Sequence, residues 1–535
     1  MRIGVDTGGT FTDVVADDGR IVKVPTTAAD PSEGVAVGIA SLGDGVPDVL
    51  AHGTTVATNA LLERRGATVA LLTTAGFRDV IEIGRQDRPS LYDPFVDRPE
   101  PLVPRELRLE VAERMAPDGE VLVAPGAIPP IPSGVDAVAV CLLHADLHPA
   151  HERLVAAELR ARGLDVTASH EVAPEFREYE RTVTTVLNAY LRPVCRRYLA
   201  ALDGLAEQVV VLTSAGGLVP VVAAAETPAA LLLSGPAGGV LAGAAAAVAA
   251  GLPDAVTFDM GGTSTDVCLV LGGQPAPAAQ RTVAGLPVRL PSLDVRTIGA
   301  GGGSIAALDP GGALTVGPRS AGAVPGPACY GRGGTKPTVT DADLVAGHLA
   351  PGTALPGIGP LSHEAAEAAL DSAAAGVTAD GVIAVVDAAM VEAVRAVTVA
   401  RGVDPAGLAL VAFGGAGPLH ACAVADALGM AAVVVPPRAG VLSAVGLLAS
   451  PLQADLVRSW PTPLDHAGLA SAARDLGELA AARLPGGDVS VRVAVDCRYE
   501  GQGHELTVPD VSAFEDEHER VNGYRREGTP IEVIA

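Results

Sequence analysis

Two stretches of this chain carry the same chemically active side chains in the same order. When Asp6 is aligned with Asp259, seven of the nine positions from Asp6 to Val14 are identical in the two copies. Each copy is a short apolar run that ends in aspartate, followed by two glycines, hydroxyl residues and a second aspartate. The copies lie close to half the chain length apart, so the sequence predicts a duplicated hairpin in which a Gly-Gly turn joins two strands.

The turn residues of both hairpins suit the phosphates of a nucleotide. Glycine tolerates positive φ and lets a ligand approach the backbone, so paired glycines can direct their amide N–H groups at an anion. Hydroxyl groups in the same turns add hydrogen-bond donors. The residues predicted to bind phosphate are Gly8, Gly9, Thr10, Thr12, Gly261, Gly262, Thr263 and Ser264, with Thr265 beside them.

The aspartates of the hairpins require a cation. Four carboxylates would repel a bare polyphosphate, and no loop lysine offsets their charge, so we expect a divalent cation between them. We interpret the pair of hairpins as a clamp for a magnesium nucleotide, with Asp6 and Asp259 as metal ligands and all four aspartates as catalytic. The four are Asp6, Asp13, Asp259 and Asp266. Ordinary Gly-Gly hairpins with solvated aspartates would explain either copy alone, but two matched copies favour the clamp.

Two further glycine-rich segments are candidate ligand contacts. Gly301, Gly302 and Gly303 form a third glycine loop, which faintly resembles a nucleophile elbow at Ser304 but suits phosphate contact better. A later loop lies between an apolar strand at 409–413 and the start of a helix. Because aromatic residues are scarce, we expect an adenine ring to lie against the glycine backbone there. The adenine contacts would be Gly414, Gly415 and Gly417.

Other polar residues have competing interpretations. His52 follows a short apolar strand and precedes Gly-Thr-Thr, a position where α/β proteins place active residues, so we expect it to be catalytic; a structural capping role is the alternative. Arg177 and Arg181 would lie on a solvated helix face or would clamp a substrate carboxylate.

A group of histidines invites a metal site. His144, His148, His151 and Glu152 are close in sequence, but no His-Glu-x-x-His motif occurs and Pro149 interrupts any single helical face. The pattern therefore favours structural histidines over a metal centre.

Composition excludes several classes of function. The chain has 535 residues, which indicates two or three domains, and it is 49% hydrophobic but only 3% aromatic. Its net charge of −25 argues against nucleic acid and anionic membrane surfaces as partners. Lysine occurs only at Lys23 and Lys336, neither within Gly-Lys-Ser/Thr, so a Walker-type phosphate loop is excluded. No complete Gly-x-Gly-x-x-Gly motif supports a dinucleotide fold.

The expected location is the cytoplasm. Six dispersed cysteines form no Cys-x-x-Cys pair, which is typical of a reducing compartment. The chain begins directly with strand-like residues, so we expect no signal peptide. The most membrane-like run, 239–252, is shorter than the roughly 20 residues that a spanning helix needs and is predicted to be a buried helix.

Strand and helix patterns alternate along the chain, which predicts an α/β fold. Continuous apolar runs at 69–73 and 135–143 indicate strands that are buried on both faces. Between them, 85–104 is rich in proline and arginine and is predicted to be a surface excursion over the substrate side. A helix near 464–484 and a strand near 489–498 suggest a small C-terminal module, followed by an exposed helix at 516–526.

The motifs together resemble known families. The two aspartate hairpins, with Phe-Gly-Gly-Ala-Gly-Pro after them, are similar to the phosphate-1, phosphate-2 and adenosine motifs of the actin, hexokinase and sugar-kinase fold. More narrowly, segments 52–60, 76–79, 233–237, 299–304 and 327–331 resemble the hydantoinase A/5-oxoprolinase family, which includes the A-type chain of N-methylhydantoinase and the corresponding chains of acetone and acetophenone carboxylases. One departure is Val403, where the family pattern has His in Glu-Arg-Gly-His-Asp-Pro.

The resemblance implies a domain organisation. It implies duplicated ribonuclease-H-like domains of the actin/hexokinase ATPase type, with a nucleotide cleft between the lobes and a small C-terminal α+β module. The expected segments are 1–175 with the first hairpin, 176–450 with the second hairpin and the adenosine loop, and 451–535 as a C-terminal module that is short for the family.

The resemblance also implies an activity. It implies a subunit of an ATP-dependent hydrolase that uses ATP and Mg²⁺ to phosphorylate the carbonyl oxygen of a cyclic amide, such as a hydantoin, 5-oxoproline or a related lactam, so that water opens the ring. Alternatives are a subunit of an ATP-dependent ketone carboxylase, and an actin-like binding protein operated by nucleotide without metabolic turnover. A B-type hydantoinase subunit is the implied partner, within an oligomer.

Overall fold

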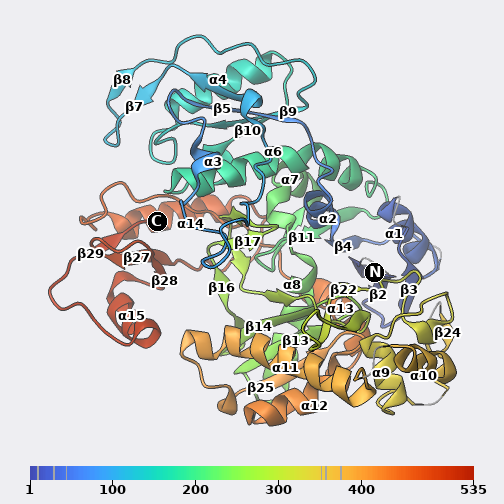
Figure 1. Ribbon diagram of the computed structural model, residues 1–535. Coiled ribbons are helices and arrows are strands. Elements are labelled where there is room, and N and C mark those ends of the chain that lie inside the picture. Colours follow the sequence, from blue (N-terminus) through green and yellow to red (C-terminus); the bar gives the residue numbers. More distant parts are fainter. Residues whose placement is uncertain (9–10, 28–29, 44, 351, 356–357, 374–375) are drawn as a thin grey trace.

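Strands and helices alternate along the chain, as the sequence predicts. The computed structural model describes residues 1–8, 11–27, 30–43, 45–350, 352–355, 358–373 and 376–535. Two mixed sheets and one parallel sheet dominate these residues, and helices cover their faces (Figure 1). The α/β class is therefore confirmed.

The first mixed sheet contains the first aspartate hairpin. Its strand order is β12-β11-β4-β1-β2-β3, in which β1, β2 and β3 form an antiparallel meander while β4 and β11 run parallel to β1. The strands are β1 (Arg2–Thr7), β2 (Phe11–Ala16), β3 (Ile21–Pro25), β4 (Val49–Thr54), β11 (Gln208–Leu212) and β12 (Leu218–Pro220). Helix α1 (Pro31–Ala40) packs on β2 and begins at Asp30, whose side chain accepts from the Ser32 amide.

The second mixed sheet repeats this arrangement around the second hairpin. Its order is β15-β14-β13-β25-β26, with the first three strands antiparallel and β25 and β26 parallel to β13. The strands are β13 (Ala255–Met260), β14 (Thr265–Leu271), β15 (Gln274–Pro275), β25 (Ala409–Phe413) and β26 (Ala432–Val434), with β20 (Arg296–Ile298) paired to β14. The repeat seen in sequence therefore extends to the order and direction of five strands.

Helices on the outer side of the second sheet bury its apolar face. They are α9 (Val339–Val345), α11 (Ala379–Val397) and α12 (Gly417–Leu428). Val386 and Val424 from these helices share one core with Phe258 and Leu410 from the strands.

Two helices connect the mixed sheets through very close backbone contact. Helix α8 (Gly235–Ala249) packs on the second sheet, α13 (Leu442–Ala449) packs on the first, and the two helices pack on each other. A Cβ atom on Gly446 would lie 1.9 Å from the Gly238 carbonyl oxygen, and one on Gly4 would lie 2.3 Å from the Ala444 carbonyl oxygen. This contact explains why the membrane-like run is rich in glycine and alanine, and it confirms the predicted buried helix.

None of the helices among the described residues combines the length and the apolar character that crossing a bilayer requires.

The third sheet is wholly parallel and lies above the mixed sheets in Figure 1. Its order is β10-β9-β5-β6, with β5 (Val69–Thr74), β6 (Arg108–Val111), β9 (Ala137–Cys141) and β10 (Val166–Ala168). Strands β5 and β9 confirm the two predicted buried strands. Helix α6 (Glu178–Ala200) lies between this sheet and the first mixed sheet, since its Leu187 shares a core with Leu50 and Leu71.

The predicted surface position of residues 85–104 is confirmed, while their place over the substrate side stays a prediction. Residues 85–104, between α3 (Val80–Ile83) and a 3-10 turn η1 (Arg105–Leu107), form neither helix nor strand and are largely exposed.

The C-terminal region forms a three-stranded sheet with flanking helices. The elements are α14 (Leu469–Ala481), β27 (Val495–Tyr499), β28 (Leu506–Val508), α15 (Phe514–Asn522) and β29 (Ile531–Val533). Its core contains Tyr499, Phe514 and Val533. The predicted segment borders do not follow the sheets one to one, because β11 and β12 join the first sheet from beyond residue 175; the borders stay a prediction.

Candidate active site

Both hairpins place two aspartates opposite each other. Asp6 pairs with Asp13 across β1 and β2, and Asp259 pairs with Asp266 across β13 and β14. The turns close in the same way, with Gly8 N donating to Phe11 O at 3.0 Å in the first hairpin. In the second hairpin, Gly261 N donates to Ser264 O at 3.0 Å. The duplicated hairpin is therefore confirmed, although the predicted contacts Gly9 and Thr10 lie outside the described residues.

Burial raises the pKa of all four aspartates. Burial, followed by the nearby carboxylates of Asp266 and Asp6, raises the pKa of Asp259 to about 8. Burial, with Asp13 next, raises the pKa of Asp6 to about 7. Since the charge of Asp6 affects Asp259, the two hairpins lie near each other. A cation near these carboxylates would stabilise their charged forms.

No loop lysine was expected to offset the charge of the hairpins, but a lysine on strand β3 offsets part of it. Lys23 lies opposite Asp13 across β2 and β3, and its Nζ is 2.6 Å from Asp13 Oδ1. The second hairpin has no such cation at the equivalent place, where the Thr297 hydroxyl donates to Asp266. The aspartates are duplicated in the two hairpins, but the residues that bond to Asp13 and Asp266 differ.

The third glycine loop supports the second hairpin from behind. Gly302 N donates to Gly261 O at 3.0 Å and Gly303 N donates to Gly262 O at 2.7 Å, while Gly301 N donates to Ser304 Oγ at 2.9 Å. The amides expected to bind phosphate are thus engaged within the protein. A Cβ on Gly301 would lie 2.7 Å from the Thr263 amide nitrogen, which explains the need for glycine.

The loop after β25 lies beside Asp259. Asp259 pairs with Phe413 at the end of β25, and the chain then turns at Gly414, whose φ is +83°. A Cβ on Gly414 would lie 2.4 Å from Asp259 Oδ1. A Cβ on Gly415 would meet nothing within 4 Å, and Gly417 begins α12. The structure therefore brings the predicted adenine loop to the second hairpin and leaves open space at Gly415.

His52 lies on the other side of the sheet from the aspartates. In the β1–β4 register His52 pairs with Val5, while its neighbour Gly53 pairs with Asp6. Its Nδ1 donates to Val5 O at 3.1 Å, and its Nε2 accepts from the Tyr198 hydroxyl at 2.7 Å. Burial lowers its pKa to about 4. The structure thus gives His52 a neutral, structural position instead of the catalytic one that the sequence suggested.

The glycine after His52 serves the site directly. A Cβ on Gly53 would lie 3.0 Å from Asp6 Oδ1, so the His-Gly-Thr-Thr segment makes room for the aspartate.

The predicted histidine group does not converge on a metal. His151 Nδ1 contacts Glu113 Oε2 at 2.8 Å, whereas His148 Nε2 donates to Pro117 O at 3.0 Å. The buried Glu152 carboxylate accepts from Leu142 N at 2.8 Å and binds His170. Within the described part of the chain, no three His, Cys, Asp or Glu side chains are placed to hold a metal ion.

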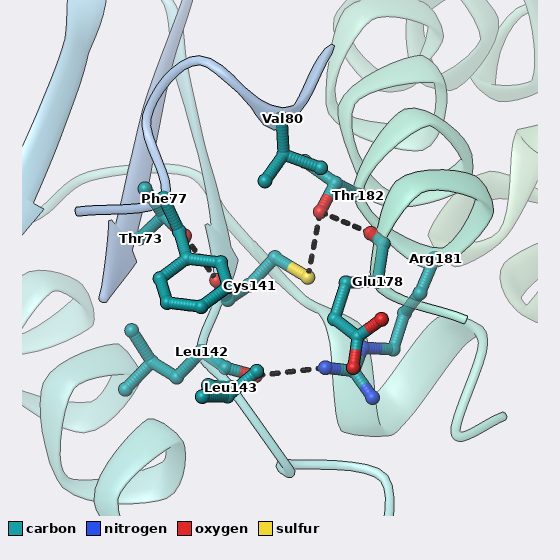
Figure 2. Close-up of a pocket in the computed structure, with 9 residues that line it drawn as sticks. All are labelled: Thr73, Phe77, Val80, Cys141, Leu142, Leu143, Glu178, Arg181 and Thr182. Carbon is teal, nitrogen blue, oxygen red and sulfur yellow. Dashed lines mark hydrogen bonds between the residues drawn. The ribbon is translucent and has the colours of Figure 1, made fainter. Parts of the chain in front are cut away.

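The two arginines proposed as a carboxylate clamp have partners inside the protein. Arg177 pairs with Glu505 of the C-terminal module at 2.6 Å. Arg181 is buried, binds Asp146 and donates to Leu142 O at 2.9 Å. Figure 2 shows Arg181 and Cys141 beside a cavity of about 10 Å³, which has room for about one water molecule. Neither arginine therefore acts as a substrate clamp in this arrangement.

These features define an α/β enzyme class with two matched mixed sheets and facing acidic hairpins. The chain belongs to the hydantoinase/oxoprolinase family. The family model described as "Hydantoinase/oxoprolinase" matches residues 181–456, and the model of the "Hydantoinase/oxoprolinase N-terminal region" matches residues 2–163. The resemblance found in the sequence is confirmed.

Known proteins resemble nearly the whole chain. The caprolactamase alpha subunit of Pseudomonas jessenii is 36% identical, covering 100% of this chain and 86% of that protein. The crystal structure of ATP-dependent caprolactamase from Pseudomonas jessenii superposes with a TM-score of 0.87 at 35% identity, over 100% of this chain and 86% of that one. The nucleotide-free structure of acetone carboxylase gives a TM-score of 0.73 at 25% identity, with the same coverages of 100% and 86%.

This chain covers a smaller share of a plant relative. 5-Oxoprolinase 1 of Arabidopsis thaliana is 33% identical over 84% of this chain and 41% of that protein.

Proposed function

We propose that this chain uses Mg-ATP to open the ring of a cyclic amide. The observation that carries the proposal is the pair of matched hairpins, each of which places two aspartates opposite each other. The glycine loop at Gly414 lies beside Asp259. Relatives described as an ATP-dependent caprolactamase and a 5-oxoprolinase support a lactam-type substrate.

We further propose that the two mixed sheets are ribonuclease-H-like lobes with the nucleotide between them. The matched order and direction of their strands support this interpretation, as does the pair of helices α8 and α13 that connects them.

The residues present fit a magnesium nucleotide. Asp6 and Asp259 would hold Mg²⁺, because their buried carboxylates gain most from a dication. The turns at Gly8 and Gly261 would face the phosphates, and the open space at Gly415 would take the adenine. When bound, Mg-ATP supplies the phosphoryl group that turns the amide oxygen into a leaving group.

Neighbouring residues determine the charge and the accessibility of the hairpin aspartates. Lys23 pairs directly with Asp13 at 2.6 Å and opposes the burial that raises the pKa of this carboxyl. Gly53 and Gly414 keep side chains away from Asp6 and Asp259 and leave the carboxylates accessible.

The test is Mg-ATP turnover against hydantoins, 5-oxoproline, lactams and ketones, with and without a co-expressed partner subunit. Asp6→Asn and Asp259→Asn remove metal ligands and should each lower turnover by about a hundredfold or more, with an unchanged circular dichroism spectrum. Wild-type rates in both variants would make the hairpins purely structural.

A second candidate is an ATP-dependent ketone carboxylase, favoured by the match to acetone carboxylase. Ketone-dependent ATP consumption that also requires bicarbonate would select it. ATP hydrolysis that no substrate stimulates would select an actin-like binding protein.

We also propose a B-type partner subunit within an oligomer. The caprolactamase relative is named as a subunit. In the surface excursion at 85–104 of this chain, the side chains of Leu91, Tyr92 and Phe95 are 77%, 95% and 89% exposed. Exposed aromatic side chains contribute nothing to the chain's own core, so they mark a candidate surface for binding another protein. The free cysteines, five of them buried, fit a reducing cytoplasm.

A further inference from the structure

A buried histidine in the second half of the chain faces two carboxylates. His420 lies on the first turn of α12, and its side chain is fully enclosed. Its Nδ1 donates to Asp387 Oδ1 of α11 at 2.7 Å. Its Nε2 is 3.4 Å from Asp343 Oδ2 of α9. The imidazole therefore joins three helices through two acidic partners.

These helices carry the candidate nucleotide loops. Helix α12 begins at Gly417, directly after the open loop at Gly414 and Gly415. Helix α9 holds the other glycine loop, because both the amide and the hydroxyl of Thr340 donate to Gly302 O, at 2.7 and 2.8 Å. The link between His420 and Asp343 consequently connects the loop beside the adenine space to the loop behind the second hairpin.

The electrostatics favour a charged imidazole. Although burial alone would lower the pKa of His420, the nearby Asp343 and the hydrogen-bonded Asp387 raise it to about 9. His348 is the other titratable group in contact, with Nδ1 3.0 Å from Asp343 Oδ1. An imidazolium between two carboxylates resists displacement more than a neutral ring would, because charge-assisted hydrogen bonds are stronger.

We propose that His420 is a positioning residue for the nucleotide: by bridging Asp343 and Asp387 it fixes the distance between the glycine loops at 301–303 and 414–417. The proposal rests on the proposed function, since it concerns the same nucleotide site. His420 itself is enclosed and would touch neither the nucleotide nor the substrate.

The first experiment compares nucleotide affinity in matched variants. His420→Gln removes the charge and one of the two links, so Mg-ATP affinity and the KM for ATP should weaken by about tenfold, while kcat changes less. His518→Gln is the control. His518 is equally buried but is bonded to uncharged groups, accepting from Gln502 Nε2 and donating to Tyr524 O, both at 2.9 Å, in the C-terminal module. It should lose stability without losing affinity.

The pH profile separates positioning from mere packing. Wild-type affinity for Mg-ATP should hold up to the region of pH 9, where His420 loses its proton, and should then weaken; the glutamine variant should show no such step. Asp387→Asn, at the partly exposed end of the bridge, should shift affinity in the same direction. If His420→Gln does not fold, the Mg-ATP affinity of Asp387→Asn tests the proposal instead.

The outcomes are distinct. Wild-type affinity in His420→Gln, or in Asp387→Asn if only that variant folds, would overturn this inference and leave the proposed function standing. A wild-type chain that binds no Mg-ATP would overturn both.

Discussion

At the scale of single residues, Asp6 and Asp259 dominate the chemistry because their environment disfavours their charge. Their pKa values of about 7 and 8 are raised from 3.8 by burial and by neighbouring carboxylates. In the folded chain both groups therefore keep protons that the unfolded chain releases at much lower pH. The stability contributed by these protons is fully present below about pH 4 and is lost as pH rises through 7 and 8.

The first prediction concerns this loss of stability with rising pH. Without metal, the melting temperature of the wild-type chain should fall between pH 5 and pH 8, measured by scanning calorimetry. Asp259→Asn keeps the shape but cannot ionise, so its melting temperature should fall less over the same range. Mg²⁺ with nucleotide should raise the wild-type value most at pH 8, where the carboxylates are charged. Parallel curves for wild type and variant would show that Asp259 is not the titrating group.

Single residues also show what a sequence can reveal. The four aspartates are predictable because duplication marks them twice. Lys23 is not recognisable as their counter-charge, because its place opposite Asp13 depends on the β2–β3 register. The face of β4 that His52 occupies, opposite the aspartates, could not be read from the sequence, because it is set by the pairing of Asp6 with Gly53.

At the scale of elements, the loop after β25 combines a strained turn with an open space. Gly414 has a φ of +83° and abuts Asp259, so any side chain there is strained and crowded. At Gly415, by contrast, a Cβ atom would have nothing within 4 Å. A side chain at Gly414 would therefore disturb the fold, whereas a side chain at Gly415 would disturb only a ligand bound there.

The second prediction uses this contrast. Gly415→Val should keep the melting temperature within about 1–2 °C but raise the KM for ATP by about tenfold or more, because the side chain occupies the proposed adenine space. Gly414→Ala should lower the melting temperature itself. Unchanged ATP affinity in Gly415→Val, measured by calorimetric titration, would place the adenine elsewhere.

Elements are predictable where the pattern is local. The buried strands β5 and β9 and the helix α8 match their apolar runs, whereas β27 begins at Val495, later than the predicted start near 489. The loop at 301–303 was expected to bind phosphate, but its amides bond within the chain, for example Gly302 N to Gly261 O. Glycine content indicates close approach without saying whether the approaching group is a ligand or the protein's own backbone.

At the scale of the whole molecule, helices α8 and α13 determine how the two mixed sheets sit together. The third prediction is that Gly446→Ala destabilises the chain by about 1–3 kcal/mol, because its Cβ would lie 1.9 Å from Gly238 O and the helices would have to separate. Gly440→Ala, where nothing lies within 4 Å, is the control and should be close to neutral. Urea unfolding measures both. Equal free energies of unfolding would mean that the helix crossing tolerates a wider spacing.

The last prediction concerns assembly. Tyr92 and Phe95 are exposed at 95% and 89% on a loop without helix or strand, so their apolar surface is free to be buried by another chain. Tyr92→Ser with Phe95→Ser should weaken co-purification with a co-expressed B-type subunit by at least about tenfold and lower amide-dependent ATP turnover of the pair, because aromatic anchors carry much of an interface's energy. The ATP affinity of the chain alone should stay unchanged. Leu154→Ser, exposed at 63% on helix α4 (Ala150–Ala161), is the matched control. If the double variant pairs as tightly as wild type, the interface lies on another face; if the chain alone opens a hydantoin or 5-oxoproline ring with stoichiometric ATP, no second subunit is needed.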